Sequence, residues 1–187
     1  HNFGDGFAKA FGIQYTGQDN KLHYVCQTSW GMTTRIIGAL IMVHGDNSGL
    51  VLPPKIAPIQ VMVIPIQQRK EGVLDAAYDI AARLKEFRVK TDDSDRSPGY
   101  KFADQEMRGI PLRIEIGPKD LENGKCVLVR RDTGEKIECA IDGVTSKVTE
   151  LLPMIQSDML TKAQKHLQTH TFPARNKEEF AEAFQET

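Results

Sequence analysis

The most constraining feature of this sequence is an alternation of strand-like and helix-like patterns between residues 58 and 170. A β-branched run at Val61–Ile66 predicts a strand, which Pro65 limits near its end. Apolar residues at helical spacing predict a helix across residues 72–88, and a short strand is expected over residues 88–91. Because strands that alternate with helices form sheets with parallel pairs, this region predicts an α/β domain.

Two further patterns add strands to that sheet. Residues 111–116 alternate apolar and charged side chains, so that Arg113 and Glu115 fall on the face opposite Leu112 and its apolar neighbours. The runs at residues 125–131 and 136–141 flank an Asp-Thr-Gly turn and predict a hairpin. The predicted fold class is therefore α/β, with a mixed sheet and flanking helices.

Two helices are expected after the hairpin. Apolar residues at positions 152, 155, 159, 163 and 167 predict a long amphipathic helix, and Pro153 fits best in its first turn. A short charged helix, residues 177–185, follows Pro173. These helices complete the expected set of elements.

The first quarter of the chain has a different character. Residues 36–43 form an apolar run and predict a helix, with Thr33 or Thr34 as its N-cap and Gly45 as the residue that ends it. A helix that is apolar on nearly every face is expected to be buried. Little sequence precedes it to provide cover, so this quarter is expected to be the edge of a larger domain. The turn-rich residues 46–59 then link it to the α/β domain.

Charge and hydropathy exclude several classes of protein. The chain has 24 Lys and Arg against 25 Asp and Glu, so any RNA binding must come from a local patch and not from bulk charge. The apolar run is far too short to span a membrane, and no secretory leader opens the sequence. A cytoplasmic location is therefore expected, with no membrane partner and no DNA partner.

Cysteine and histidine spacing predicts no metal site. Cys26, Cys126 and Cys139 form no C-x-x-C pair and are expected to be reduced thiols that fill core positions. His166 and His170 lie four residues apart, which suits a metal, but no third ligand is close in sequence. A role at the negative end of a helix dipole, or on a solvated face, is favoured for them.

Arg35 is the first candidate for a chemical role. It follows a strand-like run and stands where the apolar helix begins, so it could reach a polyphosphate together with the helix N–H groups. The alternative is an arginine that extends from a buried helix end into solvent. The pattern alone leaves both interpretations open.

The second candidate is the segment Gly117-Pro118-Lys119-Asp120, which ends a predicted strand. Backbone N–H groups, a cation and a carboxylate would meet there, at the carboxyl end of a strand, where α/β sheets often bind ligands. The simpler interpretation, favoured by the pattern alone, is a loop in which Asp120 caps the following turn.

The third candidate is the segment from Ser97 through Tyr100 and Phe102 to Glu106 and Arg108. Aromatic rings that alternate with charged side chains suit unpaired RNA bases, because rings stack on bases and charged groups contact base edges. Guanine offers N–H groups to a carboxylate, and O6 and N7 to a cation. The alternative is that the two aromatic rings pack in a small core.

Several of these segments carry a family resemblance. The run Gln27-Thr28-Ser29-Trp30-Gly31-Met32-Thr33-Thr34-Arg35, with residues 42–46 and 49–54, resembles prolyl-tRNA synthetases of the archaeal/eukaryotic-like type around the third class II signature. Residues 97–102, 108–121 and 129–135 resemble the anticodon-binding domain of the same family. The similarity covers nearly the whole chain, in the expected order.

The resemblance implies a division into domains. Residues 1–52 would be a strand–helix remnant of the antiparallel class II catalytic domain, and residues 53–170 the anticodon-binding domain. Residues 171–187 would begin a C-terminal extension. The parent activity would be the ATP-dependent attachment of proline to its tRNA, by a homodimer that uses ATP and Mg²⁺.

The resemblance also implies roles for individual residues. Arg35 would contact the ATP phosphates as the catalytic arginine, with Thr33 beside it in the nucleotide site. The proline pocket would be lined by His1, Ser29, Trp30 and Gly31. The two guanines of the proline anticodon would be recognised by Glu106, Arg113, Lys119 and Asp120, and no residue is assigned to a metal.

The sequence departs from the family pattern in ways that limit this chain. Only Gly31 and Thr34 stand where the usual third motif has several glycines and a glutamate, and segments resembling the first two motifs are missing. The cysteines of the family's zinc domain do not follow residues 177–185 either. We therefore expect negligible aminoacylation by the chain alone. The alternatives are a tRNA-binding module without catalysis and, more remotely, a protein-interaction domain that has lost RNA.

Overall fold

The computed structural model describes residues 1–185, and the chain divides into two compact units, with the second beginning at Leu40. The first unit, residues 1–39, holds four short strands and a helix. The boundary that the family resemblance implies at residue 52 separates two regions by function and not by compactness. It stays a prediction.

The first unit is built from two antiparallel strand pairs. β1 (Asn2–Gly4) pairs with β4 (Gln27–Thr28), and β2 (Gln14–Thr16) pairs with β3 (Leu22–Tyr24). The short helix α1 (Gly6–Phe11) follows β1. Among the described residues 1–39 only Ala8 is buried, so this unit has almost no core of its own.

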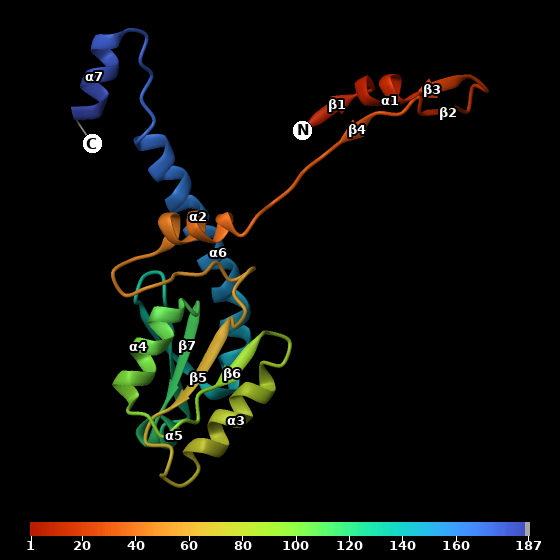
Figure 1. Ribbon diagram of the computed structural model, residues 1–187. Helices are drawn as coiled ribbons and strands as arrows, with labels where there is room; N and C mark the ends of the chain where they lie inside the picture. Colours follow the sequence, from red (N-terminus) through yellow and green to blue (C-terminus); the bar gives the residue numbers. More distant parts are fainter. Residues whose placement is uncertain (186–187) are drawn as a thin grey trace. The chain divides into compact units, whose positions relative to one another are not determined.

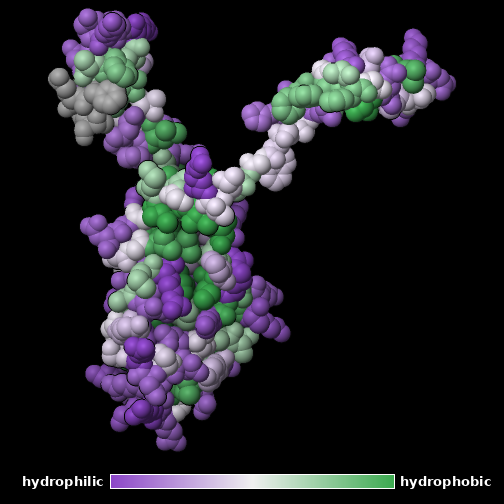
Figure 2. All heavy atoms as spheres, in the orientation of Figure 1, coloured by the Kyte–Doolittle hydropathy of each residue, from purple (hydrophilic) through white to green (hydrophobic). Residues whose placement is uncertain are grey.

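The helix α2 (Arg35–His44) begins directly after Thr34 and ends before Gly45, as the sequence predicts. No residue of α2 is buried, and Ile37 and Met42 are among its most exposed side chains, which agrees with the expectation that this part of the chain has too little sequence to cover the helix. Figure 2 shows hydrophobic side chains gathered on the surface over α2. The physical reason is that the described residues provide no apolar layer around this helix.

The second unit contains a five-stranded sheet in the order β6-β5-β7-β8-β9. β5 pairs in parallel with β6 and β7, whereas β8 pairs antiparallel with β7 and β9, so the mixed sheet is confirmed. The five strands are β5 (Val61–Pro65), β6 (Val89–Thr91), β7 (Leu112–Ile116), β8 (Lys125–Arg130) and β9 (Lys136–Ala140).

Helices cover both faces of this sheet (Figure 1). Val61 and Val63 of β5 point to the main core, which α3 (Val73–Arg83) and α6 (Val144–Thr169) complete. Met62 and Ile64 point to the other face, where they pack with Phe102 of α4 (Pro98–Arg108) and with Ile110. The remaining elements are α5 (Pro118–Glu122), a short 3₁₀ helix (Ile141–Gly143) and α7 (Lys177–Gln185).

Two helix boundaries differ from the sequence expectation. α3 ends at Arg83 and not near residue 88. α6 begins at Val144, so Pro153 lies inside the helix and not in its first turn. A proline there removes the hydrogen bond to the Thr149 carbonyl, at a cost of about 3 kcal/mol. The buried residues Val148 and Leu151 continue the helical spacing before the proline, and their burial offsets that cost.

The helix α4 was not predicted, although its signals are present in the sequence. Ser97 is the N-cap, and its hydroxyl oxygen accepts a hydrogen bond from the Tyr100 N–H at 3.4 Å. Pro98 stands in the first turn, and Gly109 ends the helix with a left-handed backbone.

Candidate nucleic-acid interface

The site is built on β7, whose alternating side chains serve two different surfaces. Leu112 and Ile114 point to the main core. Arg113 and Glu115 point to the face that carries α4, where each is only 7% exposed. Because α4 packs over β5 through Phe102, it stands beside β7 and brings its own charged side chains to this face.

Glu106, Arg113 and Glu115 form a compact charge cluster. The Arg113 Nε donates a hydrogen bond to Glu115 Oε1 at 2.8 Å, and the Arg113 Nη1 donates to Glu106 Oε1 at 3.1 Å. The guanidinium carbon also lies 4.4 Å from the centre of the Phe102 ring. Two carboxylates therefore share one guanidinium, and the cluster has one negative charge in excess.

This arrangement has the chemistry to recognise guanine. A carboxylate accepts the guanine N1–H and N2–H groups, and a guanidinium donates to O6 or N7. Glu106 and Arg113 line a pocket of about 530 Å³. Gln105 lines the same pocket, and its Oε1 is buried without a hydrogen-bond partner among the described residues. The pocket thus combines donors and acceptors in a partly desolvated setting, where such contacts discriminate best.

The other two predicted residues lie at the opposite end of β7. Asp120 Oδ2 accepts a hydrogen bond from the Gly117 N–H at 2.9 Å, so this carboxylate caps α5 as the simpler interpretation of the sequence proposed. Lys119 is exposed. The described contacts join Glu106 to Arg113 but join neither of them to Lys119 or Asp120. The structure therefore brings together one pair of the four residues.

The two aromatic residues of α4 have different environments. Phe102 is half-buried in the small core and lies under the Arg113 guanidinium, so the packing interpretation holds for this ring. Tyr100 is 51% exposed, and the Arg96 guanidinium stands 4.6 Å from its ring centre. Tyr100 remains available for contact with a ligand.

Sequence analysis missed several residues of this face. The alternation at residues 111–116 places Glu115 on the same face as Arg113, but the sequence analysis does not assign Glu115 to the site. Gln105 gave no signal. Arg131 donates through Nε to the Glu106 carbonyl oxygen at 2.9 Å and also binds Asp46, a contact between residues 85 positions apart. No local pattern predicts such a pair.

The residues predicted to contact ATP and proline lie near the start of the chain. Arg35 is the first residue of α2, and its N–H donates to Thr33 Oγ1 at 3.4 Å. His1 and Ser29 are brought together by two backbone contacts, of 2.7 and 2.9 Å. Trp30, 86% exposed, and Gly31 lie in a segment without helix or strand.

The three cysteines differ in how far they are buried. Cys126 is buried and Cys139 partly buried, but Cys26 is exposed, so its expected place in a core is wrong. Burial raises the pKa of the Cys126 thiol to about 12.

His170 lies next to the end of α6, with its Nδ1 at 2.8 Å from the His166 carbonyl oxygen. Within residues 1–185, no group of three or more His, Cys, Asp or Glu side chains is arranged to hold a metal, and no helix could cross a membrane.

Known proteins resemble this chain closely. Residues 60–151 match the family described as the anticodon binding domain. The chain is 63% identical over 182 residues to a proline–tRNA ligase of Lachnoclostridium phytofermentans, a match that covers 97% of this chain and 38% of that protein. It is 64% identical over 181 residues to a proline–tRNA ligase of Agathobacter rectalis, which covers 96% of this chain and 38% of that protein.

A third relative gives the same proportions. A proline–tRNA ligase of Ruminiclostridium cellulolyticum is 56% identical over 188 residues, which covers 100% of this chain and 39% of that protein. The chain thus spans about two fifths of the length of the curated relatives that it matches. Residues 60–151 thus match the anticodon binding domain family, and the chain is similar over nearly its whole length to part of these proline–tRNA ligases.

Proposed function

We propose that this chain is the tRNA-recognising part of a proline–tRNA ligase and that it recognises the guanines of the proline anticodon. The observation that carries the proposal is the Glu106–Arg113–Glu115 cluster, which lies inside the anticodon binding domain and presents a carboxylate and a guanidinium to one pocket. Lys119 and Asp120, at the other end of the same strand, would contact the second guanine.

The parent protein would attach proline to its tRNA at the expense of ATP. In that reaction Arg35 would stabilise the negative charge of the pyrophosphate leaving group, and Thr33 would line the nucleotide site. His1, Ser29, Trp30 and Gly31 would form one wall of the proline pocket. The support is the family resemblance of residues 27–35 and the position of Arg35 at a helix N-terminus.

The remaining partners follow from the same proposal. Arg35 and the N–H groups of α2 are hydrogen-bond donors, so they fit phosphate oxygens and not a metal ion. The Mg²⁺ that accompanies ATP would therefore take its protein ligands from other parts of the parent enzyme. The parent is expected to be a cytoplasmic homodimer.

The chain by itself is proposed to bind tRNA without catalysing its charging. Only Thr33, Arg35 and part of the proline pocket are assigned to it, and positioning of both substrates needs more of the active site. Proline-dependent exchange of pyrophosphate into ATP is therefore expected to stay at background with the isolated chain. An exchange rate above background would contradict this part of the proposal.

The decisive test is binding of the chain to proline tRNA at one fixed, near-physiological salt concentration. The comparison is a transcript whose two anticodon guanines are changed to cytosines. A preference of about tenfold or more for the guanine form, roughly 1.4 kcal/mol, is the expected result. Equal binding of the two transcripts, or no binding, would contradict the proposed recognition of bases.

A further inference from the structure

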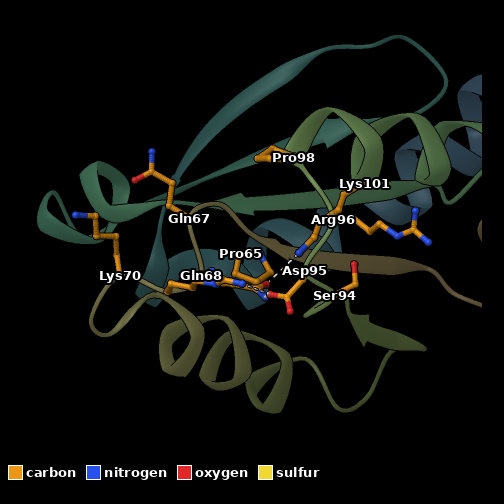
Figure 3. Close-up of a pocket in the computed structure, with 10 residues that line it drawn as sticks. Pro65, Gln67, Gln68, Lys70, Ser94, Asp95, Arg96, Pro98 and Lys101 are labelled. Carbon is orange, nitrogen blue, oxygen red and sulfur yellow. Dashed lines mark hydrogen bonds and ion pairs between the residues drawn. The ribbon is translucent and has the colours of Figure 1, made fainter.

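A second pocket, of about 600 Å³, lies at the carboxyl end of β5, away from the Glu106–Arg113 pair. Figure 3 shows that two segments line it. Gln67, Gln68 and Lys70 come from the turn after β5, and Asp95, Pro98 and Lys101 from the segment that leads into and begins α4. Crevices at the carboxyl ends of parallel strands are the usual ligand sites of α/β sheets.

The lining of this pocket is strongly cationic. Arg69, Lys70, Arg96 and Lys101 contribute four positive charges, and Asp95 is the one carboxylate that lines it among the described residues. Arg69 binds Asp95 at 3.3 Å, with both side chains well exposed, so that this pair is weak. Among the described residues, Lys70 has no ion-pair partner. The residues that line the pocket therefore carry a net positive charge, which the neighbouring Asp92 carboxylate, 4.0 Å from the Lys101 Nζ, balances only in part.

Lys101 gives the pocket a fixed charge. Its side chain is only 2% exposed, and its Nζ donates to Gln68 Oε1 at 3.1 Å and to the Asp92 carbonyl oxygen at 2.7 Å. The Asp92 carboxylate stands at 4.0 Å, outside hydrogen-bond distance. An ammonium group has three N–H donors, so one stays unused among the described contacts. A held, desolvated ammonium with a free donor is suited to an anion.

The acidic residues nearby also accept hydrogen bonds from the hydroxyl groups of other residues. Asp92 Oδ1 accepts hydrogen bonds from the N–H and hydroxyl of Ser94, and Asp93 Oδ2 accepts from the Tyr78 hydroxyl at 2.7 Å. Both carboxylates line a separate pocket. They therefore reduce the cationic field at the pocket but do not occupy it.

The pocket adjoins the turn that carries two of the predicted anticodon residues. β5 and β7 are parallel neighbours, and the Ile66 N–H donates to the Ile116 carbonyl oxygen at 2.8 Å. The turn after β5 and the turn Gly117–Asp120 thus leave the same edge of the sheet side by side. An RNA strand whose base reached Lys119 and Asp120 would carry its backbone past this pocket.

We propose that this pocket, formed by Arg69, Lys70, Arg96 and Lys101, binds one backbone phosphate of the RNA strand whose bases contact β7 and the turn after it. The inference extends the proposed function and rests on it for the choice of RNA. A phosphodiester carries one negative charge and two unesterified oxygens, which suit the free Lys101 donor and the exposed cations at the pocket mouth. This contact would increase affinity and fix register without reading sequence.

The test compares two double variants of the full chain. Arg69→Gln with Lys70→Gln removes an ion-paired arginine and an unpaired lysine from the pocket mouth. Arg83→Gln with Lys85→Gln is the matched control, because Arg83 is ion-paired on α3 and Lys85 is exposed nearby. Lys101 is left unchanged, since loss of a buried ammonium could unfold the domain. Thermal unfolding of both variants checks that they remain folded.

The first readout is binding of the anticodon stem–loop of proline tRNA at several salt concentrations. The pocket variant is expected to bind about five- to tenfold more weakly, with the slope of log K against log salt smaller by about 0.7 to 1. Its preference for guanine over cytosine in the anticodon should stay unchanged. An unchanged slope, or a loss of guanine preference, would overturn the proposal.

The second readout identifies the phosphate. Stem–loops with one neutral methylphosphonate at each loop position are compared in turn. One position should weaken binding to the wild-type chain and leave the pocket variant unaffected, since its contact is already lost. If no position behaves in this way, or if inorganic phosphate binds the pocket and RNA does not displace it, the assignment to the RNA backbone is wrong.

These measurements also separate the inference from the proposed function. If the wild-type chain binds RNA without guanine preference but the slope falls in the pocket variant, recognition of the anticodon bases fails and the phosphate site stands. If guanine preference is present and the slope does not change, the phosphate site fails alone. If the chain binds no RNA, both fail.

Discussion

Asp46 and Arg131, 85 positions apart in the chain, form an ion pair in which both carboxylate oxygens accept from the guanidinium at 2.6 Å. The same guanidinium donates through Nε to the carbonyl oxygen of Glu106, near the end of α4. Asp46 precedes the matched anticodon domain, which begins at residue 60. The segment after α2 therefore holds in place the helix that carries a proposed guanine contact.

The Asp46–Arg131 pair predicts a change of stability with pH. Hydrogen bonds from Arg131 lower the Asp46 pKa from 3.8 to about 2. A carboxyl whose pKa is lower in the folded state stabilises the fold above the unfolded pKa, and this contribution is lost as the pH falls from about 4 to about 2. Asp46→Asn should therefore lower the free energy of unfolding at pH 7 by about 1 kcal/mol, because the Asp46 side chain is half-exposed and solvent weakens the pair.

Urea unfolding of the Asp46→Asn variant at several pH values checks this prediction. The difference from the wild-type chain should shrink below about pH 4 and vanish near pH 2. Asp142→Asn, which removes one fully exposed partner of Arg83, is the control and should have a smaller effect. A constant difference at every pH would show that the charge of Asp46 is not the cause.

Gly109 is predicted to resist substitution because a backbone passes close to it. Its φ is +69°, and an added Cβ would lie 2.6 Å from the Leu50 carbonyl carbon and oxygen. Gly134 has a similar φ of +73° but nothing within 4 Å, so Gly134→Ala carries the backbone strain alone, about 1 kcal/mol. Gly109→Ala should cost about 1–3 kcal/mol more. Equal losses in chemical denaturation would contradict the close approach.

Glu106 is predicted to determine the preference for guanine. Glu106→Gln keeps the shape of the side chain but replaces a carboxylate oxygen by a donor, which opposes the guanine N–H groups. The preference for guanine over cytosine anticodons should fall about tenfold, or 1.4 kcal/mol, in equilibrium binding. Glu86→Gln, at an exposed position after α3, is the control and should keep the preference. A full preference in the Glu106 variant would exclude this residue from base recognition.

Asp120 has a capping role that must be separated from recognition. Its Oδ2 accepts the Gly117 N–H, so Asp120→Ala should lower the free energy of unfolding by about 1 kcal/mol. Asp120→Asn keeps an acceptor oxygen and should cost less than about 0.5 kcal/mol. If Asp120 also contacts guanine, both variants should lose guanine preference in RNA binding. Retention of the preference by the stable Asn variant would leave Asp120 with the structural role alone.

The three thiols are predicted to react at very different rates. Burial raises the pKa of Cys126 to about 12 and also raises the pKa of Cys139, so both stay protonated at pH 8. Cys26 is exposed and should react rapidly with a disulfide reagent. The absorbance change should show one fast thiol in the folded chain and three in urea. Cys26→Ser should abolish the fast phase, and a fast phase that persists would contradict the assignment.

Elements that depend on residues close together in the sequence were predicted, whereas features that depend on contacts between distant residues were not. The alternation at residues 111–116 and the turn at residues 132–134 led to β7 and to the β8–β9 hairpin, because strand period and turn chemistry are local properties. The limits of α2 were predicted for the same reason. Pro153 lies inside α6 and not in its first turn, because the burial of Val148 and Leu151, a tertiary effect, stabilises the helix before the proline.

By itself, the sequence determined the α/β class, the mixed sheet and the charged face of β7, since each follows from periodicity and turn residues near in the chain. Tertiary structure alone decided which charges meet. It paired Glu106 with Arg113, turned Asp120 toward Gly117, buried Lys101 beside Gln68 and joined Asp46 to Arg131. The last of these contacts joins residues far apart in the chain. Its geometry depends on how helices and strands pack, which no local pattern encodes.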